Sequence, residues 1–176
     1  MTILLLGDSH LARLRDLGQD DLEALLGTPV ENRAVGGSTV RALPGQAAGL
    51  DLSSYDAVVV SLGTNDAGQW GDVPLADFRP RLASVVGSVA TRWVAVTTPG
   101  VDGASTPDGR RSNDVMSGYA DALASVVEGA GGVTVWSRDV IASLGSDGFQ
   151  DDGFHLTPSA YDLLLPAIAK AVASLR

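Results

Sequence analysis

The sequence predicts an α/β fold in which a parallel sheet of five strands is covered by helices on both faces. Five short apolar runs recur along the chain. Between them lie segments whose apolar residues are spaced three and four apart, as in amphipathic helices. Continuous apolar strands that alternate with helices are typical of parallel sheets buried on both sides. We therefore expect three layers, with the sheet in the middle.

The N-terminal part of the chain contains the first two strands. Ile3–Leu6 is the first apolar run, and a helical pattern with a break near Gly18 follows it to about Leu26. Val30–Val35 alternates in part and ends at a pair of glycines, which predicts a second strand. A helix over Thr39–Ala48 is expected next.

The middle of the chain repeats this alternation. Ala57–Ser61 is a β-branched run that predicts the third strand, and Trp93–Thr97 predicts the fourth. Either Ser112 or Asn113 can cap a later helix that reaches about Glu128. The helix between the third and fourth strands is indicated by apolar residues at helical spacing: Leu75, Phe78, Leu82, Val85, Val86 and Val89.

The C-terminal part supplies the last strand and the last helix. Val133–Trp136 predicts the fifth strand. Thr157 and Pro158 are suited to the cap and first turn of a helix that runs to about Leu175, with a kink at Pro166. Right-handed crossovers bring the carboxyl ends of all the strands to one edge of the sheet, where ligands of such folds bind.

Length and composition limit the kinds of protein this chain can be. Its 176 residues are typical of one domain, so we expect residues 1–176 to form a single unit. A net charge of −9, with Lys170 as the only lysine, disfavours binding to nucleic acid or to an anionic membrane surface. Ile3–Leu6 is too short for a signal-peptide core and no run is long enough to span a membrane, so we expect a cytoplasmic protein.

Metal and cofactor sites are not expected. The chain has no cysteine, and its two histidines, at positions 10 and 155, do not have the spacing of metal ligands. Neither a phosphate-binding Gly-rich loop with lysine nor a dinucleotide-binding pattern follows the first strand.

Three polar motifs lie at the edge of the sheet where ligands are expected. They are Gly7-Asp8-Ser9 after the first strand, Gly63-Thr64-Asn65-Asp66 after the third, and Asp152-Gly153-Phe154-His155 before the last helix. A serine hydroxyl is a weak nucleophile that needs a general base, and the base needs a group that orients it. Ser9, His155 and Asp152 are candidates for these roles. Asp151 is the alternative orienting group.

Each motif also has a purely structural interpretation. Asp8 or Ser9 can cap the helix that follows, and His155 can be a solvated loop residue. Asn65 can be a turn residue or can donate its amide to a developing oxyanion. Gly37 can be a turn glycine or can allow its backbone N–H to approach a substrate.

Taken together, the motifs resemble the SGNH hydrolases, the superfamily that includes the GDSL-type lipases and esterases. The four matching blocks occur in family order: Gly7-Asp8-Ser9-His10, Asn32 to Gly37, Gly63-Thr64-Asn65-Asp66, and Asp152 to His155. The resemblance implies a three-layer α/β/α sandwich with a flavodoxin-like five-stranded parallel sheet. It also implies that Ser9 is the nucleophile of a triad with His155 and Asp152. The oxyanion hole would consist of the Ser9 amide, Gly37 and Asn65, with Gly36 as the alternative to Gly37.

Several other residues near these motifs have open interpretations. His10, where the family usually has an apolar residue, either packs locally or contacts the substrate. Trp70 either lines a substrate pocket or has a structural role. Asp66 is expected to pair locally or cap a turn. Arg110 and Arg111 are expected to be solvated, with binding of an anionic substrate group as the alternative.

These observations predict a serine esterase that hydrolyses a small-molecule carboxylic ester through an acyl-enzyme. A short acyl group is expected, and deacetylation of a carbohydrate is one candidate reaction. The same residues would serve an O-acyltransferase in which an alcohol replaces water. A non-catalytic binding module on a flavodoxin-like sheet is the third hypothesis. The sequence does not indicate the oligomeric state.

Overall fold

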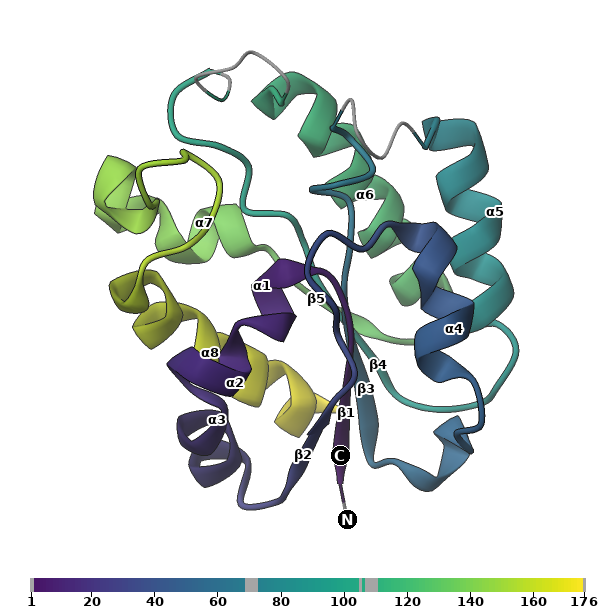
Figure 1. Ribbon diagram of the computed structural model, residues 1–176. Helices are drawn as coiled ribbons and strands as arrows, with labels where there is room; N and C mark the ends of the chain where they lie inside the picture. Colours follow the sequence, from purple (N-terminus) through teal and green to yellow (C-terminus); the bar gives the residue numbers. More distant parts are fainter. Residues whose placement is uncertain (1, 69–72, 105, 107–110, 176) are drawn as a thin grey trace.

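The computed structural model describes residues 2–68, 73–104, 106 and 111–175 (Figure 1). Within these residues, one all-parallel sheet of five strands has the order β2-β1-β3-β4-β5. This is the flavodoxin-like order, and it confirms the predicted fold class. The strands are β1 (Ile3–Gly7), β2 (Val30–Asn32), β3 (Ala57–Ser61), β4 (Trp93–Val96) and β5 (Val133–Val135).

Helices cover both faces of the sheet (Figure 1). The residues buried with one face come largely from α1 (Ser9–Ala12), α2 (Leu14–Leu17), α3 (Gln19–Leu26), α7 (Ser137–Ile141) and α8 (Pro158–Ser174). Those buried with the other come largely from α4 (Leu43–Ala47), α5 (Leu75–Val86) and α6 (Asn113–Gly129). Three 3₁₀ segments complete the described elements: η1 (Val40–Ala42), η2 (Leu52–Ser54) and η3 (Ala142–Gly148).

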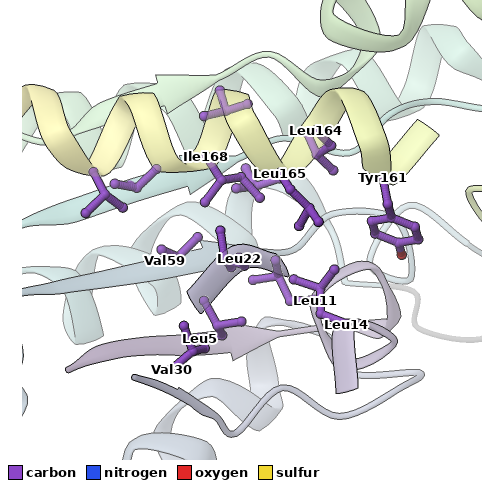
Figure 2. Close-up of a cluster of buried hydrophobic side chains, with 14 of the residues drawn as sticks. Leu5, Leu11, Leu14, Leu22, Val30, Val59, Tyr161, Leu164, Leu165 and Ile168 are labelled. Atoms are coloured by element: carbon purple, nitrogen blue, oxygen red, sulfur yellow. The ribbon is translucent and has the colours of Figure 1, made fainter. Parts of the chain in front are cut away.

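Alternate residues of the three central strands, β1, β3 and β4, point into different cores. In β1, Ile3 and Leu5 belong to the cluster beneath α8, whereas Leu4 and Leu6 belong to the cluster beneath α5 and α6. All four are fully buried. Burial of one such side chain stabilises the fold by about 1.5–3 kcal/mol, so this short strand contributes to both cores. Figure 2 shows part of the first cluster, where residues of α8 face Leu5, Leu22 and Val59.

The register of the sheet brings the carboxyl ends of β1 and β3 together. Gly7 lies opposite Ser61, and the amide of Asp8 donates a hydrogen bond to Ser61 O at 3.0 Å. The residues that follow these two strands therefore leave the sheet side by side. This register determines where the first and second of the three polar motifs, those after β1 and β3, meet.

Some element boundaries differ from the predicted ones. The helical stretch up to Leu26 is divided into α1, α2 and α3. The second strand ends at Asn32, although the amides of Arg33 and Val35 still donate to carbonyls of β1. The helix expected over residues 39–48 begins with η1 and becomes α-helical only at α4, where a proline occupies the first turn.

The segment between β5 and the last loop is helical, which the sequence analysis did not predict. It contains α7 and η3. The amide of Ser137 at the start of α7 donates to Thr97 Oγ1 at 3.1 Å, and Ile141 is buried in the core. These are tertiary contacts, and a five-residue helix has too little periodicity to be recognised without them.

The last helix follows its predicted range, with differences in detail. Pro166 lies inside α8 without ending it. Thr157 occupies the N-cap position, but its hydroxyl donates to Asp147 O at 2.9 Å instead of accepting from the helix. Ser112, by contrast, caps α6 by accepting from the Val115 amide. None of the helices described by the structure is both long enough and apolar enough to cross a membrane.

Candidate active site

Ser9 is the first residue of α1, directly after β1. The preceding residue, Asp8, caps the helix because its Oδ1 accepts a hydrogen bond from the His10 amide at 3.1 Å. The Ser9 hydroxyl is therefore not needed as the cap. Its own amide belongs to the first helical turn, whose N–H groups have no partner within the helix. The hydroxyl and this amide can thus serve the same reaction centre.

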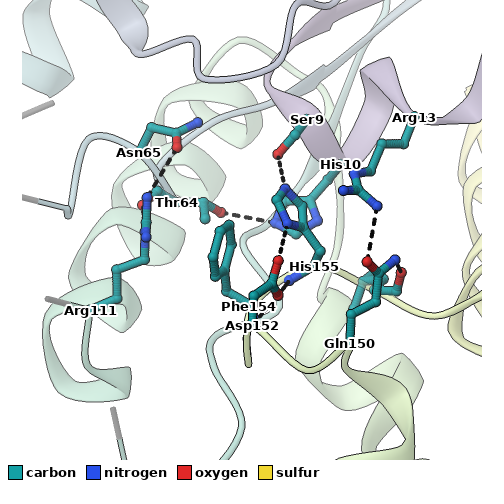
Figure 3. A network of polar contacts seen from close by, with 11 residues as sticks. Ser9, His10, Arg13, Thr64, Asn65, Arg111, Gln150, Asp152, Phe154 and His155 are labelled. Atoms are coloured by element: carbon teal, nitrogen blue, oxygen red, sulfur yellow. Dashed lines mark hydrogen bonds and ion pairs between the residues drawn. The ribbon is translucent and has the colours of Figure 1, made fainter. Parts of the chain in front are cut away.

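His155 brings the far end of the chain to Ser9 (Figure 3). Its Nε2 lies 3.2 Å from Ser9 Oγ, although 146 positions separate the two residues. Its Nδ1 lies 2.6 Å from Asp152 Oδ2. With the proton on Nδ1 directed at the carboxylate, Nε2 has a lone pair for the serine proton. The exposed Asp151 makes no such contact, which favours Asp152 as the orienting group.

Asp152 is itself held in place by the backbone. Its Oδ1 accepts hydrogen bonds from the amides of Phe154 at 3.1 Å and His155 at 2.9 Å. Partial burial would raise the pKa of Asp152, but these amides and the imidazole outweigh it, and the net shift is downward. The carboxylate is therefore ionised where a histidine acts as a base.

Two residues that the sequence analysis did not single out support the His155 loop. Gln150 donates its amide to His155 O at 2.8 Å and its Nε2 to Leu156 O at 2.7 Å. Arg13, one turn after Ser9, donates to Gln150 Oε1 at 3.3 Å. This chain of contacts connects the helix that carries Ser9 to the loop that carries His155.

Both polar atoms of the Asn65 carboxamide make hydrogen bonds. Its Nδ2 donates to Ser38 O at 3.0 Å, and its Oδ1 accepts from Arg111 Nη2 at 3.4 Å. An amide nitrogen carries two hydrogens, so one remains for an oxyanion.

The two glycines before Ser38 form a tight turn next to Ser9. The turn is closed by the Ser38 amide, which donates to Val35 O at 3.2 Å. Gly37 has φ +78°, a conformation that favours glycine. A Cβ on Gly36 would lie 3.9 Å from Ser9 Cβ, so the turn passes beside the serine. Both candidate glycines thus belong to the loop that faces the hydroxyl.

Two side chains anchor this loop. Asp66 accepts hydrogen bonds from the amides of Val40 at 2.8 Å and Gly63 at 3.1 Å, so it pairs locally, as expected, and also connects the motif after β3 to η1, which follows the Gly36-Gly37 turn. Gln46 accepts from the Gly7 amide at 2.6 Å and donates to Gly7 O and Ser38 Oγ. Gln46 was not identified from the sequence, because nothing in its local pattern indicates a contact 39 positions away.

The motif histidine, His10, is 1% exposed and packs locally. Its Nε2 lies 3.2 Å from Thr64 Oγ1, and the threonine hydroxyl donates to Thr98 Oγ1 at 2.9 Å. Burial, and secondarily the nearby His155, lower the pKa of His10 to about 3, so its imidazole is neutral at pH 7. These observations favour the packing interpretation over a substrate contact.

The expectation that Arg111 is solvated is wrong. The residue is 9% exposed. Its Nε donates to Thr64 O at 3.1 Å, and its Cζ lies 4.4 Å from the centroid of the Phe154 ring. Its position just before α6 turns the side chain towards the sheet edge, which the sequence pattern does not indicate. Arg110 and Trp70 lie outside the described residues.

Sequence comparison identifies the family. The sequence profile of the GDSL-like lipase/acylhydrolase family matches residues 5–163, a range that includes Ser9, Asn65, Asp152 and His155. The chain belongs to the GDSL-like lipase/acylhydrolase family. It is therefore a member of a hydrolase family, as the four matching blocks indicate. Among curated proteins, none matches the chain significantly.

Solved structures show that this GDSL-family chain has the fold of known hydrolases. The lipase/acylhydrolase from Enterococcus faecalis has a TM-score of 0.85 and 21% identity, covering 99% of this chain and 96% of its own. A carbohydrate acetylesterase from Sinorhizobium meliloti has a TM-score of 0.77, 19% identity and 99% coverage of both chains. An acetylxylan esterase from Geobacillus stearothermophilus has a TM-score of 0.75 and 18% identity, covering 97% of this chain and 93% of its own. At these identities the similarity concerns the fold.

Two buried carboxyl groups of this GDSL-family chain, those of Asp8 and Asp66, lie next to Ser9 and Asn65 in the sequence. Burial raises the pKa of Asp8 to about 7, partly offset by the His10 amide and reinforced by Asp66. Burial likewise raises the pKa of Asp66 to about 6, although the hydrogen bonds from Val40 and Gly63 lower it.

Among the described residues, no three His, Asp or Glu side chains are grouped as metal ligands would be.

Proposed function

We propose that the protein is a serine esterase that hydrolyses carboxylic esters. The observation that carries this proposal is the 3.2 Å separation of Ser9 Oγ and His155 Nε2, with Asp152 at 2.6 Å on the other imidazole nitrogen. A serine hydroxyl becomes nucleophilic when a base accepts its proton, and an oriented imidazole meets that requirement. Membership of a lipase/acylhydrolase family supports an ester as the substrate.

In the proposed reaction, Ser9 Oγ attacks the acyl carbon while His155 Nε2 accepts the serine proton. The negative charge on the carbonyl oxygen is stabilised by the amides of Ser9 and Gly37 and by the second Nδ2 hydrogen of Asn65. His155 then donates its proton to the leaving alcohol, which leaves an acyl-serine. Water attacks the acyl-serine by the same steps, with His155 again as the base, and releases the carboxylic acid.

We propose a short acyl group, with acetyl esters of carbohydrates as the first class to test. Two proteins of similar fold are described as a carbohydrate acetylesterase and an acetylxylan esterase, and the fold aligns over nearly their full length. Ser9 is only 7% exposed, which fits a small acyl group better than a bulky one. Esters graded from acetyl to decanoyl, run beside acetylated xylo-oligosaccharides, would measure this preference.

Active-site labelling tests the proposal directly. A fluorophosphonate should attach to Ser9, identified by peptide mass spectrometry, and the attachment should be much slower in His155→Ala. Ser9→Ala should lower kcat for a p-nitrophenyl ester by at least roughly 10⁴-fold while the thermal unfolding curve stays close to that of wild type. Full activity of Ser9→Ala, or labelling at another residue, would contradict the assignment. An added alcohol would reveal acyl transfer as a second product.

A further inference from the structure

The buried guanidinium of Arg111 contacts two of the three motifs that form the candidate active site. It donates hydrogen bonds to Thr64 and Asn65 of the motif after β3 (Figure 3). It also lies over the aromatic ring of Phe154 in the last motif. We propose that Arg111 is a positioning residue that orients the Asn65 carboxamide for oxyanion binding. This inference rests on the proposed function, because it concerns a donor to the oxyanion of ester hydrolysis.

Burial of a cation in the protein interior is costly unless its donors are satisfied. Arg111 is 9% exposed, and its fork reaches the carbonyl of Thr64 with Nε and the side-chain oxygen of Asn65 with Nη2. The neighbouring Gly68 leaves the necessary space, since a Cβ there would lie 3.3 Å from Nε and Nη2. The guanidinium thus occupies a fitted position next to the Asn65 turn.

The contacts of Asn65 select one of the two orientations of its carboxamide. A guanidinium can only donate hydrogen bonds, so it requires Oδ1 on its side. The Ser38 carbonyl can only accept, so it requires Nδ2 on the other side. A flipped carboxamide would set two donors against each other at Arg111 and two acceptors against each other at Ser38. The observed orientation leaves one Nδ2 hydrogen for the oxyanion.

The same guanidinium also supports the loop of the general base. Its Cζ lies 4.4 Å from the centroid of the Phe154 ring, an arrangement in which a cation and an aromatic face attract each other. The Phe154 ring in turn lies 4.2 Å, centroid to centroid, from the imidazole of His155. Arg111 therefore bridges the oxyanion donor and the residue next to the base.

The backbone of Arg111 is anchored, so the side chain has a defined origin. Its amide donates to Thr106 Oγ1 at 3.1 Å, and its carbonyl accepts from the Thr106 amide at 2.8 Å. The next residue, Ser112, caps α6. The Arg111 side chain is thus fixed at its backbone and at its guanidinium, and a change in the position of the guanidinium should be transmitted to Asn65.

Arg111→Lys tests the inference, because lysine keeps the charge but cannot span Thr64 O and Asn65 Oδ1 with a rigid fork. We expect kcat for an acetyl ester to fall by roughly 10- to 100-fold, with KM within about twofold of wild type. Arg33→Lys is the control, since Arg33 pairs with Glu31 at the surface, and its kcat should match wild type. An unchanged kcat in Arg111→Lys, or a change confined to KM, would overturn the assignment.

A double-mutant cycle separates positioning from general structural damage. If Arg111 acts through Asn65, then Arg111→Lys should lower kcat by less than about threefold in an Asn65→Ala background. An equal loss in both backgrounds would show that Arg111 acts independently of Asn65, and the inference would then be wrong.

Nuclear magnetic resonance provides a readout that requires no esterase activity. The side-chain amide signals of Asn65, assigned by their loss in Asn65→Ala, should shift in Arg111→Lys and stay unchanged in Arg33→Lys. In wild type, the Nε–H of Arg111 should exchange with solvent more slowly than that of exposed arginines. Unshifted amide signals in folded Arg111→Lys would overturn the inference. Fast Nε–H exchange of Arg111 in wild type would also overturn it, and this measurement does not require the variant to fold. Absence of esterase activity with these signals as expected would contradict the proposed function alone.

Discussion

At the scale of single residues, the Asn65 side chain is fixed by two hydrogen bonds and keeps one N–H group for a substrate. The Ser38 carbonyl occupies one of its donors, and Arg111 occupies its acceptor. In the proposed reaction, the remaining N–H is already oriented, so no reorganisation is needed when negative charge develops on a substrate oxygen. Donors fixed in this way stabilise a transition state more than mobile donors do.

Replacement of Asn65 tests this role. Asn65→Ala should lower kcat by roughly 10²- to 10³-fold, because one oxyanion donor is lost. Loss of its hydrogen bonds to Ser38 O and to the Arg111 guanidinium should lower the free energy of unfolding by about 2–4 kcal/mol, less than the total stability of a typical domain, so the variant should remain folded. Steady-state kinetics together with urea denaturation would separate the two effects. Wild-type turnover in a folded variant would remove Asn65 from the oxyanion hole.

At the scale of the element, the end of β1 sets the position of Ser9, the proposed nucleophile. Gly7 pairs with Ser61, and its N–H and carbonyl both bond to the side chain of Gln46. Gly7 has φ +126°, and a Cβ on it would lie 1.9 Å from Ser61 O. The strand can therefore turn into α1 beside β3 only with glycine at this position.

Gly7→Ala should destabilise the protein by at least about 3 kcal/mol, because steric overlap with backbone is added to an unfavourable φ. Thermal or urea denaturation would measure the loss. Gly129→Ala at the end of α6 is the matched control, since a Cβ there meets nothing within 4 Å. The control should change stability by less than about 1 kcal/mol. Equal stabilities of the two variants would show that the β1 end can relax.

At the scale of the whole molecule, the acidic chain keeps some of its carboxyl groups inside. Asp8 and Asp66, which follow β1 and β3, are buried and have raised pKa values, whereas the pKa of Asp152 is lowered. For Asp8, the folded state retains a proton that the unfolded chain loses above about pH 4. Its contribution to stability is therefore complete below its ordinary pKa and is lost as the pH rises to about 7. Asp152 acts in the opposite sense, and its contribution is lost as the pH falls through its lowered pKa.

In Asp8→Asn, the free energy of unfolding should decrease less between about pH 4 and pH 7 than it does in wild type. Asparagine resembles the protonated carboxyl group and can still accept the hydrogen bond from the His10 amide. The difference in unfolding free energy between the variant and wild type should change in favour of the variant by on the order of a few kcal/mol as the pH rises from 4 to 8. Urea denaturation at a series of pH values would measure this, with the exposed Asp162→Asn as control. Parallel curves for Asp8→Asn and wild type would show that Asp8 titrates normally.

Local pattern was sufficient to predict some features and insufficient for others. The apolar runs around Leu5, Val59 and Val94 are β-branched or short and lie between turn residues, and they form strands of a sheet that is buried on both faces. By contrast, α7 and η3 depend on tertiary contacts such as that between Ser137 and Thr97, and they were not predicted. The burial of Arg111 was not predicted either, because two adjacent arginines in a polar loop resemble solvated residues in any sequence.

The sequence by itself determined the layered α/β fold, the family and the three motifs with their order, since each depends on residue type and short-range spacing. Only the tertiary structure decided which atoms meet. The pairing of Gly7 with Ser61 and the return of the last loop to α1 bring His155 within 3.2 Å of Ser9. Contacts between residues more than a hundred positions apart arise from packing of whole elements, and packing leaves little trace in the local sequence. For the same physical reason, the contacts of Arg111, Gln46 and Gln150 were found only in the folded molecule.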